Sequence, residues 1–297
     1  MKYKIVGIGE LLWDFLPSGK MRGGAPGNFV YHASALGAEG KLISRVGNDP
    51  LGHELTAELK ALELSAEAVQ IDPVNPTGTV TVELCDSQPR FTIHEGVAWD
   101  HIELTDPALQ IVRDADAICF GSLAQRHEES RNAIQKLVST TRASTLRIFD
   151  VNLRQHFFSR EIIEQSLKLS NVVKLNDAEL PIIAGLFDIK GCPADQLKKL
   201  ARQFNLRLVA LTRGERGSLL YSMDHWFEHP GFPGEVKDTV GAGDSFTAAL
   251  TIGLLQGLVL DEVNRCANEL ASFVCSQDGA TPLLPERLLT NTIKRET

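Results

Sequence analysis

The sequence predicts an α/β protein, a three-layer α/β/α sandwich with a mainly parallel central sheet and a small second sheet. Two observations carry this prediction. Short apolar runs alternate with segments of helical spacing along most of the chain, and two extended segments interrupt that alternation. Because neighbouring parallel strands need a crossover long enough to return the chain, repeated strand, helix, strand units favour a parallel sheet with helices on both faces.

The individual elements follow from the spacing of the apolar residues. The expected strands lie near residues 3–8, 41–46, 116–120, 146–151, 171–175, 207–212 and 217–221. The expected helices lie near residues 27–37, 51–62, 127–141, 159–169, 193–203, 243–257 and 261–276.

Two segments, 10–24 and 72–100, break the alternation and predict the small sheet. The first is an extended run closed by Pro17-Ser18-Gly19, and the second holds extended stretches at 79–84 and 90–94 around a polar turn. If both leave the main sheet on the same side, they form a lid over its carboxyl edge, where open α/β sheets bind ligands. The exposed edges of lid strands are natural pairing surfaces, so we expect a homodimer formed lid to lid.

The charge balance points to a small-molecule partner. The 297 residues include 30 Lys and Arg against 38 Asp and Glu, a formal charge of -8, which argues against binding to nucleic acid or to an anionic membrane surface. The five cysteines are odd in number, widely spaced and without a CxxC pair. We therefore expect neither a disulfide framework nor a cysteine zinc site, and a cytoplasmic location fits. No stretch approaches the ~18 apolar residues of a membrane span.

The sequence Asp238-Thr239-Val240-Gly241-Ala242-Gly243-Asp244 places a carboxylate directly after a small-residue turn that opens into a long apolar helix. A ligand can approach the backbone N–H groups of Gly241, Ala242 and Gly243, which lack bulky side chains and intrahelical partners. The helix dipole adds partial positive charge there. The turn therefore predicts a site that holds a phosphate in transfer, with Asp244 facing a substrate hydroxyl. The alternative is that Asp244 only caps the helix.

Other polar residues are expected at the same edge of the sheet. Asp14, Asp49, Asn152, Asn176 and Gly214 each lie just after a predicted strand, so the sheet would deliver them together. Any one of them alone is typical of a turn. Their convergence predicts a binding site.

A glycine-rich turn at residues 23–28 precedes a helical pattern. Its small residues allow the backbone to lie close to a ligand, and Asn28 can both donate and accept hydrogen bonds, as a sugar hydroxyl requires. The alternative is a lid hinge in which Asn28 caps the helix.

Asn176 and Glu179 lie three residues apart where a strand ends and a short helix begins, so they share a helix face. Their oxygens suit Mg²⁺, held directly or through water, and the alternative is that the two residues cap the helix together. The loop at residues 212–217 joins two apolar runs. It is either a tight turn against a nucleotide phosphate or a plain hairpin turn.

Together these motifs resemble the ribokinase-like, or PfkB, carbohydrate kinases over nearly the whole chain. The second signature of that family is matched without a break from Asp238 to Ala249. The first signature is matched at Gly23, Gly24, Pro26, Asn28, Gly37 and Gly47. Val30 departs from the pattern, because the family usually has Ser, Thr or Ala there. The resemblance implies one ribokinase-like kinase domain over residues 1–297.

The resemblance also implies a role for each matched position. Asp244 is the implied catalytic base, and the anion hole comprises Gly241, Ala242 and Gly243. The implied sugar-binding residues are Asp14, Gly24, Asn28, Asn152 and Arg154. The implied nucleotide-binding residues are Lys174, Thr212, Gly214, Gly217, Asn268 and Gly279. Asn176 and Glu179 would position Mg²⁺. Members of the family often hold a monovalent cation such as K⁺, here near Asp238 and Val240, and the side chains alone leave open whether this chain does.

The implied reaction is Mg²⁺-dependent transfer of the γ-phosphoryl group of ATP to a sugar hydroxyl. Residues 9–15, 23–28, 76–80 and 150–154 look similar to those of bacterial fructokinases, so the expected reaction converts fructose to fructose 6-phosphate. Ribose and 2-keto-3-deoxygluconate are the alternative acceptors. A non-catalytic sugar or nucleotide sensor is the alternative from another class, and the presence of both the base and the anion-hole glycines disfavours it.

Overall fold

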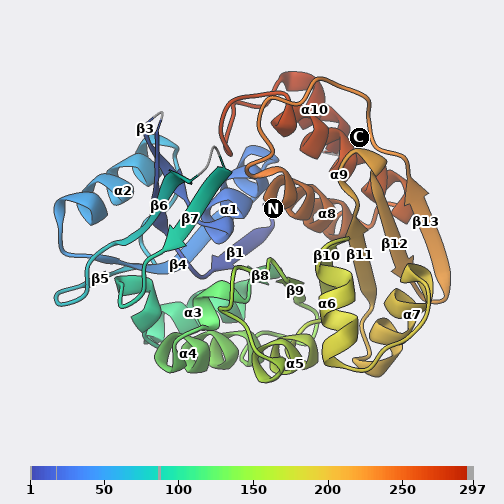
Figure 1. The fold of residues 1–297 in the computed structure, drawn as a ribbon, viewed down its shortest axis with the longest axis horizontal. Helices are drawn as coiled ribbons and strands as arrows, with labels where there is room; N and C mark the ends of the chain where they lie inside the picture. The colour runs from blue at the N-terminus through green and yellow to red at the C-terminus, as the bar shows by residue number, and fades with distance from the viewer. Residues whose placement is uncertain (1, 18, 86–87, 293–297) are drawn as a thin grey trace.

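The computed structural model describes residues 2–17, 19–85 and 88–292. Within them, nine strands form one sheet in the order β13-β12-β11-β10-β9-β8-β1-β4-β5 (Figure 1). Their bounds are β1 Lys4–Ile8, β4 Glu39–Gly47, β5 Val69–Asp72, β8 Ala117–Phe120, β9 Leu146–Asp150, β10 Val172–Asn176, β11 Leu208–Thr212, β12 Ser218–Ser222 and β13 His225–His229. All neighbours are parallel except at one end, where β12 is antiparallel to both β11 and β13. The predicted α/β class is confirmed.

All seven strands expected from apolar runs are present in this sheet. The sequence pattern does not indicate β5 and β13, for two physical reasons. Both lie at the edges of the sheet, and both mix polar with apolar residues, VQID in β5 and HWFEH in β13. An edge strand that packs on one side needs no apolar run.

Helices cover both faces of the sheet (Figure 1). One face carries α1 (Ala25–Ala35), α8 (Ala242–Leu255) and α9 (Leu260–Cys275). The other carries α3 (Asp106–Asp114), α4 (Glu128–Ser139), α5 (Arg160–Leu169), α6 (Glu179–Leu186) and α7 (Pro193–Gln203). The remaining two are α2 (Pro50–Ala61), beside β4, and α10 (Glu286–Thr292), against α8 and α9. Across the described part of the chain, no helix is both long and apolar enough to cross a membrane.

The central strands are buried on both faces, which explains their continuous apolar runs. In β8, for example, Ala117 and Cys119 belong to the core under α1, α8 and α9, whereas Ile118 and Phe120 belong to the core under α3 to α7. This is the period of two that a strand imposes on its side chains.

Val30, the departure from the family pattern, is accommodated by two glycines. Its side chain is completely buried in α1. A Cβ atom at Gly7 would lie 2.7 Å from one methyl of Val30, and a Cβ at Gly40 would lie 2.8 Å from the other. The space that those two residues leave is therefore filled by the larger side chain at position 30.

A second, four-stranded sheet has the order β3-β2-β6-β7. Its strands are β2 (Leu12–Leu16), β3 (Gly19–Gly23), β6 (Gly78–Cys85) and β7 (Gln88–Ile93). The pairs β2–β3 and β6–β7 are antiparallel, and β2 joins β6 in parallel. These strands come from the two segments expected to form the small sheet. Parts of both predicted turns, Ser18 and residues 86–87, lie outside the described residues. That this sheet works as a lid stays a prediction.

Candidate active site

The start of α8 has the backbone geometry that an anion site needs. Gly241 precedes the helix with φ 77°, a left-handed conformation that favours glycine. A Cβ atom there would also lie 2.6 Å from the carbonyl oxygen of Ala280. The N–H of Ala242 donates to the Thr239 carbonyl at 3.3 Å, so the first-turn N–H groups of Gly243 and Asp244 are the donors best placed for a ligand.

Asp244 is the third residue of α8, so the alternative that it caps the helix is wrong. Its Oδ2 instead accepts a hydrogen bond of 2.9 Å from Nδ2 of Asn28 on α1. Asn28 is not a cap either, because α1 begins after Gly24, which has φ 111°. Burial and the nearby Asp150 carboxylate raise the pKa of Asp244 to about 6, although the Asn28 hydrogen bond acts against them.

A buried ion pair lies beneath this helix start. Lys174 Nζ contacts Asp150 Oδ1 at 3.0 Å, and Thr247 Oγ1 donates to Asp150 Oδ2 at 2.8 Å. A Cβ atom at Gly243 would lie 2.8 Å from Lys174 Nζ, so the ammonium packs against the anion-hole turn itself. Burial acts to lower the pKa of Lys174, but Asp150 and other carboxylates raise it above its usual value. The lysine therefore stays protonated beside the positive end of the helix dipole, although Asp150 is paired with it.

Glu10, which the sequence motifs do not assign to the site, lies two residues after the end of β1 and is almost completely buried. Its Oε1 accepts from the Ala25 N–H at 3.3 Å, and its buried Oε2 has no partner among the residues that the structure describes. Burial, with a contribution from Asp244, raises the pKa of Glu10 to about 7, against the opposing charge of Arg154. The sequence shows only an acidic residue two positions beyond the first strand, and this position alone does not reveal the burial.

Glu10→Gln should reduce the pH dependence of folding. A carboxyl whose pKa rises from 4.5 to about 7 on folding binds protons better in the folded state, so its stabilising contribution is lost as pH rises through that window. Wild type should therefore lose more unfolding free energy between about pH 5 and pH 8 than the variant. Urea unfolding at both pH values measures this difference. Glu39→Gln, at an exposed position, is the control, and equal pH dependence in wild type and Glu10→Gln would contradict the assignment.

Asp14 and Arg154 connect the small sheet to this centre. Asp14 lies on β2, and its Oδ2 occupies the space over Gly23, where a Cβ atom would lie at 2.2 Å. Burial raises the pKa of Asp14 to about 6 and the Arg154 charge acts to lower it. Arg154 acts in the same direction on Asp244 and Glu10, so one exposed guanidinium lies within electrostatic reach of all three carboxyls.

The loop after β9 carries Asn152 in a left-handed conformation, φ 42°, which asparagine tolerates better than most residues. Ser122 Oγ donates to the Val151 carbonyl at 2.8 Å and fixes the start of this loop. Further along, Gln155 Nε2 donates to the Phe91 carbonyl on β7 at 2.7 Å. The loop therefore links the carboxyl edge of the main sheet to the small sheet.

Asn176 and Glu179 form the capping arrangement that was the alternative to a metal site. Glu179 accepts from the Asn176 N–H through Oε2 and from the Leu153 N–H through Oε1, both at 2.8 Å. Asn176 Oδ1 accepts from the N–H groups of Ala178 and Glu179, both at 2.9 Å. Because these oxygens already accept backbone hydrogen bonds and Glu179 is buried, direct ligation of Mg²⁺ does not fit. A role through water stays a prediction.

Asp49, also expected at the edge, has a structural role. Its carboxylate accepts from the Gly52 N–H at the start of α2 and from both the N–H and the hydroxyl of Thr77. Burial acts to raise the pKa of Asp49, but these hydrogen bonds hold it below its usual value. Asp49 thus joins α2 to the segment that enters β6.

Four of the predicted nucleotide residues lie at the far end of the same edge, whereas Lys174 packs against the start of α8 and Gly279 donates to Asp238. Thr212 ends β11, and Gly214 begins the short 3-10 turn η3 (Gly214–Arg216), so the hairpin alternative for this loop is present. Gly217 ends that turn with φ 72°. Asn268 is buried and donates through Nδ2 to Ser218 Oγ at 2.6 Å, which directs its amide between α9 and β12.

Asp238, which is expected near a monovalent cation together with Val240, joins two loops through its carboxylate. Asp238 accepts from the Val240 N–H at 2.9 Å and from the Gly279 N–H at 3.2 Å. The predicted cation residues are therefore in one place, although the cation itself stays a prediction.

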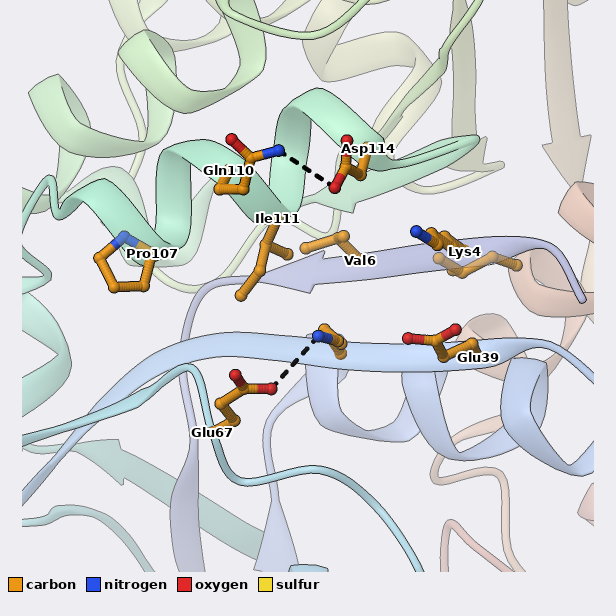
Figure 2. Close-up of a pocket in the computed structure, with 10 residues that line it drawn as sticks. Lys4, Val6, Glu39, Glu67, Pro107, Gln110, Ile111 and Asp114 are labelled. Atoms are coloured by element: carbon orange, nitrogen blue, oxygen red, sulfur yellow. Dashed lines mark hydrogen bonds and ion pairs between the residues drawn. The ribbon is translucent and has the colours of Figure 1, made fainter.

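A pocket elsewhere is distinct from this centre. It is lined by the first residues of β1 and β4 and by one side of α3, so it lies at the opposite end of β1 from Glu10 (Figure 2). Two polar pairs lie within its lining, since Lys41 contacts Glu67 at 3.2 Å and Gln110 contacts Asp114 at 3.1 Å. No predicted site residue is among its lining residues.

Comparison with known proteins identifies the class of molecule that carries this site. An uncharacterized sugar kinase of Pyrococcus horikoshii is 32% identical over 306 residues, covering 96% of this chain and 94% of the relative. Its crystal structure matches with a TM-score of 0.84 and covers 97% of this chain and 98% of that one. A second crystal structure of that protein, in complex with ATP, matches with a TM-score of 0.82, 32% identity and coverage of 93% and 94%.

Fructokinases are similar at slightly lower identity. Fructokinase-2 of Solanum lycopersicum is 30% identical, with 95% of this chain and 93% of the relative covered. The fructokinase of Klebsiella pneumoniae is 29% identical, with 96% and 97% covered. Residues 19–287 match the pfkB family carbohydrate kinase domain. The chain therefore belongs to the PfkB family of carbohydrate kinases.

Proposed function

We propose that this carbohydrate kinase transfers the γ-phosphoryl group of ATP to a hydroxyl of fructose and forms fructose 6-phosphate. The observation that carries the proposal is the arrangement around Asp244. Its carboxylate is oriented by Asn28, stands in the first turn of α8 beside open backbone N–H groups, and lies above the buried cation Lys174. A base and an anion site are thus adjacent, as phosphoryl transfer to an alcohol requires.

In the proposed reaction the sugar hydroxyl oxygen attacks the γ-phosphorus, and the bond from that phosphorus to the bridging oxygen of ADP breaks. The hydroxyl proton passes to the Asp244 carboxylate. The amides at the start of α8 and the Lys174 charge stabilise negative charge on the group in transfer. When bound, Mg²⁺ would neutralise charge on the ATP phosphates, with Asn176 and Glu179 acting on it through water. ATP as the donor is supported by the ATP complex of the Pyrococcus relative.

Fructose as the acceptor is supported by the two fructokinases near 30% identity and by the residues on the sugar side. Asn28 of α1 donates to Asp244, and Arg154 of the loop after β9 acts on both Asp244 and Asp14 of the small sheet. Ribose and 2-keto-3-deoxygluconate are the alternative acceptors. A non-catalytic sensor is disfavoured, because a sensor needs no base with a raised pKa beside an anion site.

A panel of sugars tests the acceptor. With ATP and Mg²⁺ in a coupled assay, fructose should give a higher kcat/KM than ribose or 2-keto-3-deoxygluconate. Asp14→Asn should raise the KM for fructose by about 10-fold or more, since a hydrogen bond to a charged group is worth ~1.5–3 kcal/mol, and should leave the KM for ATP unchanged. Asp261→Asn, at an exposed position in α9, is the control. Preference for ribose, or no turnover of fructose, would overturn the choice of sugar.

Two further proposals concern assembly and activation. A homodimer would form through the small sheet, whose edge strands are β3 and β7 and whose exposed side chains include Phe15 and Phe91. An activating K⁺ would bind where Asp238 joins the two loops.

A further inference from the structure

Two histidines and a glutamate lie close together where the chain leaves the small sheet after β7. The proposed kinase reaction uses none of these three residues. His101 ends the short 3-10 turn η1 (Ala98–His101), which follows β7. His127 directly precedes α4, and Glu129 lies in the first turn of that helix. One nitrogen or oxygen from each of the three side chains lies within 4.8 Å of the others.

The three side chains are already held close to one another. His101 Nδ1 and Glu129 Oε2 are 2.6 Å apart. The rings of His101 and His127 have centroids 4.7 Å apart and are tilted by 53°.

From this arrangement we propose that His101, His127 and Glu129 bind one divalent transition-metal ion of the zinc class. Two imidazoles and a carboxylate are a donor set that Zn²⁺ and Co²⁺ accept, and three protein ligands leave a fourth position for water. Mg²⁺ and Ca²⁺ prefer oxygen ligands only. The proposed ion is therefore chemically distinct from the Mg²⁺ that accompanies ATP.

The charges around the cluster permit a cation. The positive end of the α4 dipole disfavours a bound cation. Glu128 and Glu129 both lie in the first turn of α4, and their negative charges offset that positive end. Arg45 lies close enough to act on Glu129. Its guanidinium is already paired with Asp72 at 2.8 Å and with Glu103.

The site joins two elements that other polar contacts already connect. Asp100 of η1 forms an ion pair of 2.7 Å with Arg126, next to the start of α4, and the Ile102 N–H donates to Ser130 Oγ at 2.7 Å. A metal ion shared by His101, His127 and Glu129 would add a further connection between the segment after β7 and α4. Because an ion that binds only the folded chain stabilises it, binding should raise the melting temperature.

Binding is tested on the full chain with the metal ions alone. Calorimetric titration with Zn²⁺ and visible absorption of Co²⁺ should show one equivalent in wild type that excess Mg²⁺ does not displace. His127→Gln is the decisive variant, because it leaves the hydrogen bond between His101 and Glu129 in place. It should weaken binding by at least ~10-fold, the lower end of the effect of losing even a supporting partner of a metal ligand. His101→Gln and Glu129→Gln should do the same.

His225→Gln removes an exposed histidine on β13 and is the matched control. It should bind the ion as wild type does, so any contribution from cysteines cancels in the comparison. Zn²⁺ should also raise the melting temperature of wild type and of His225→Gln, and not that of His127→Gln. Equal affinity in wild type and His127→Gln, displacement by Mg²⁺, or an equal shift in melting temperature would each overturn the proposal.

Discussion

Asp244→Asn should lower kcat by at least ~10²-fold, the usual effect of losing a positioned base, while sugar and ATP still bind. An amide cannot accept the hydroxyl proton at neutral pH. It can still accept the hydrogen bond that Asn28 Nδ2 donates to this position at 2.9 Å, so the site should keep its shape. Steady-state kinetics with fructose and ATP, together with calorimetric binding of each substrate, separates the two effects.

The wild-type pH profile provides a second measure of the same role. Asp244 is a base only when deprotonated, and its pKa is raised to about 6. The kcat/KM of wild type should therefore increase with pH through about 6 and then level off. Asp261→Asn, on the exposed surface of α9, should keep both the rate and the profile. Near-normal turnover by Asp244→Asn would show that the carboxylate is not the base.

The main sheet could be predicted from the sequence because its strands are buried on both faces. Ile118 and Phe120 fill one core while Ala117 and Cys119 fill the other, so the strand appears as an unbroken apolar run. β13 lacks that signal because it is an edge strand. α3 is not among the expected helices, although Thr105 before Asp106 and Pro107 is a helix start signal and does cap the helix. The helix is short and lies between the segments with clear helical spacing.

The site could be predicted only where a motif or the family resemblance supplied the long-range contact. Nothing local shows that Asn28 reaches Asp244, because the two residues are 216 positions apart. Whether Asp244 caps the helix or faces a substrate depends on where the helix begins, to within a few residues. A single sequence does not fix helix boundaries to that accuracy. Burial raises the pKa of Glu10, and this burial depends on packing by other segments of the chain. The position of Glu10 after a strand therefore does not indicate that it is buried.

Lys174→Met should destabilise the protein by ~3–5 kcal/mol, the range measured when one partner of a buried ion pair is removed. The Asp150 carboxylate would remain buried with the Thr247 hydroxyl as its hydrogen-bond donor. Urea unfolding measures the loss. Lys41→Met is the matched control, because it breaks a more exposed pair with Glu67 and should cost no more than about 1 kcal/mol.

The double variant Asp150→Asn with Lys174→Met separates stability from catalysis. It leaves no buried charge at this position, so it should recover most of the unfolding free energy lost in Lys174→Met. Activity should not recover, because the ammonium that packs against Gly243 is still missing and charge on the transferring group loses its cation. If the single variant is as stable as wild type, the pair is not buried as described. If the double variant regains turnover, Lys174 serves the fold alone and the anion site depends on the α8 amides and Mg²⁺.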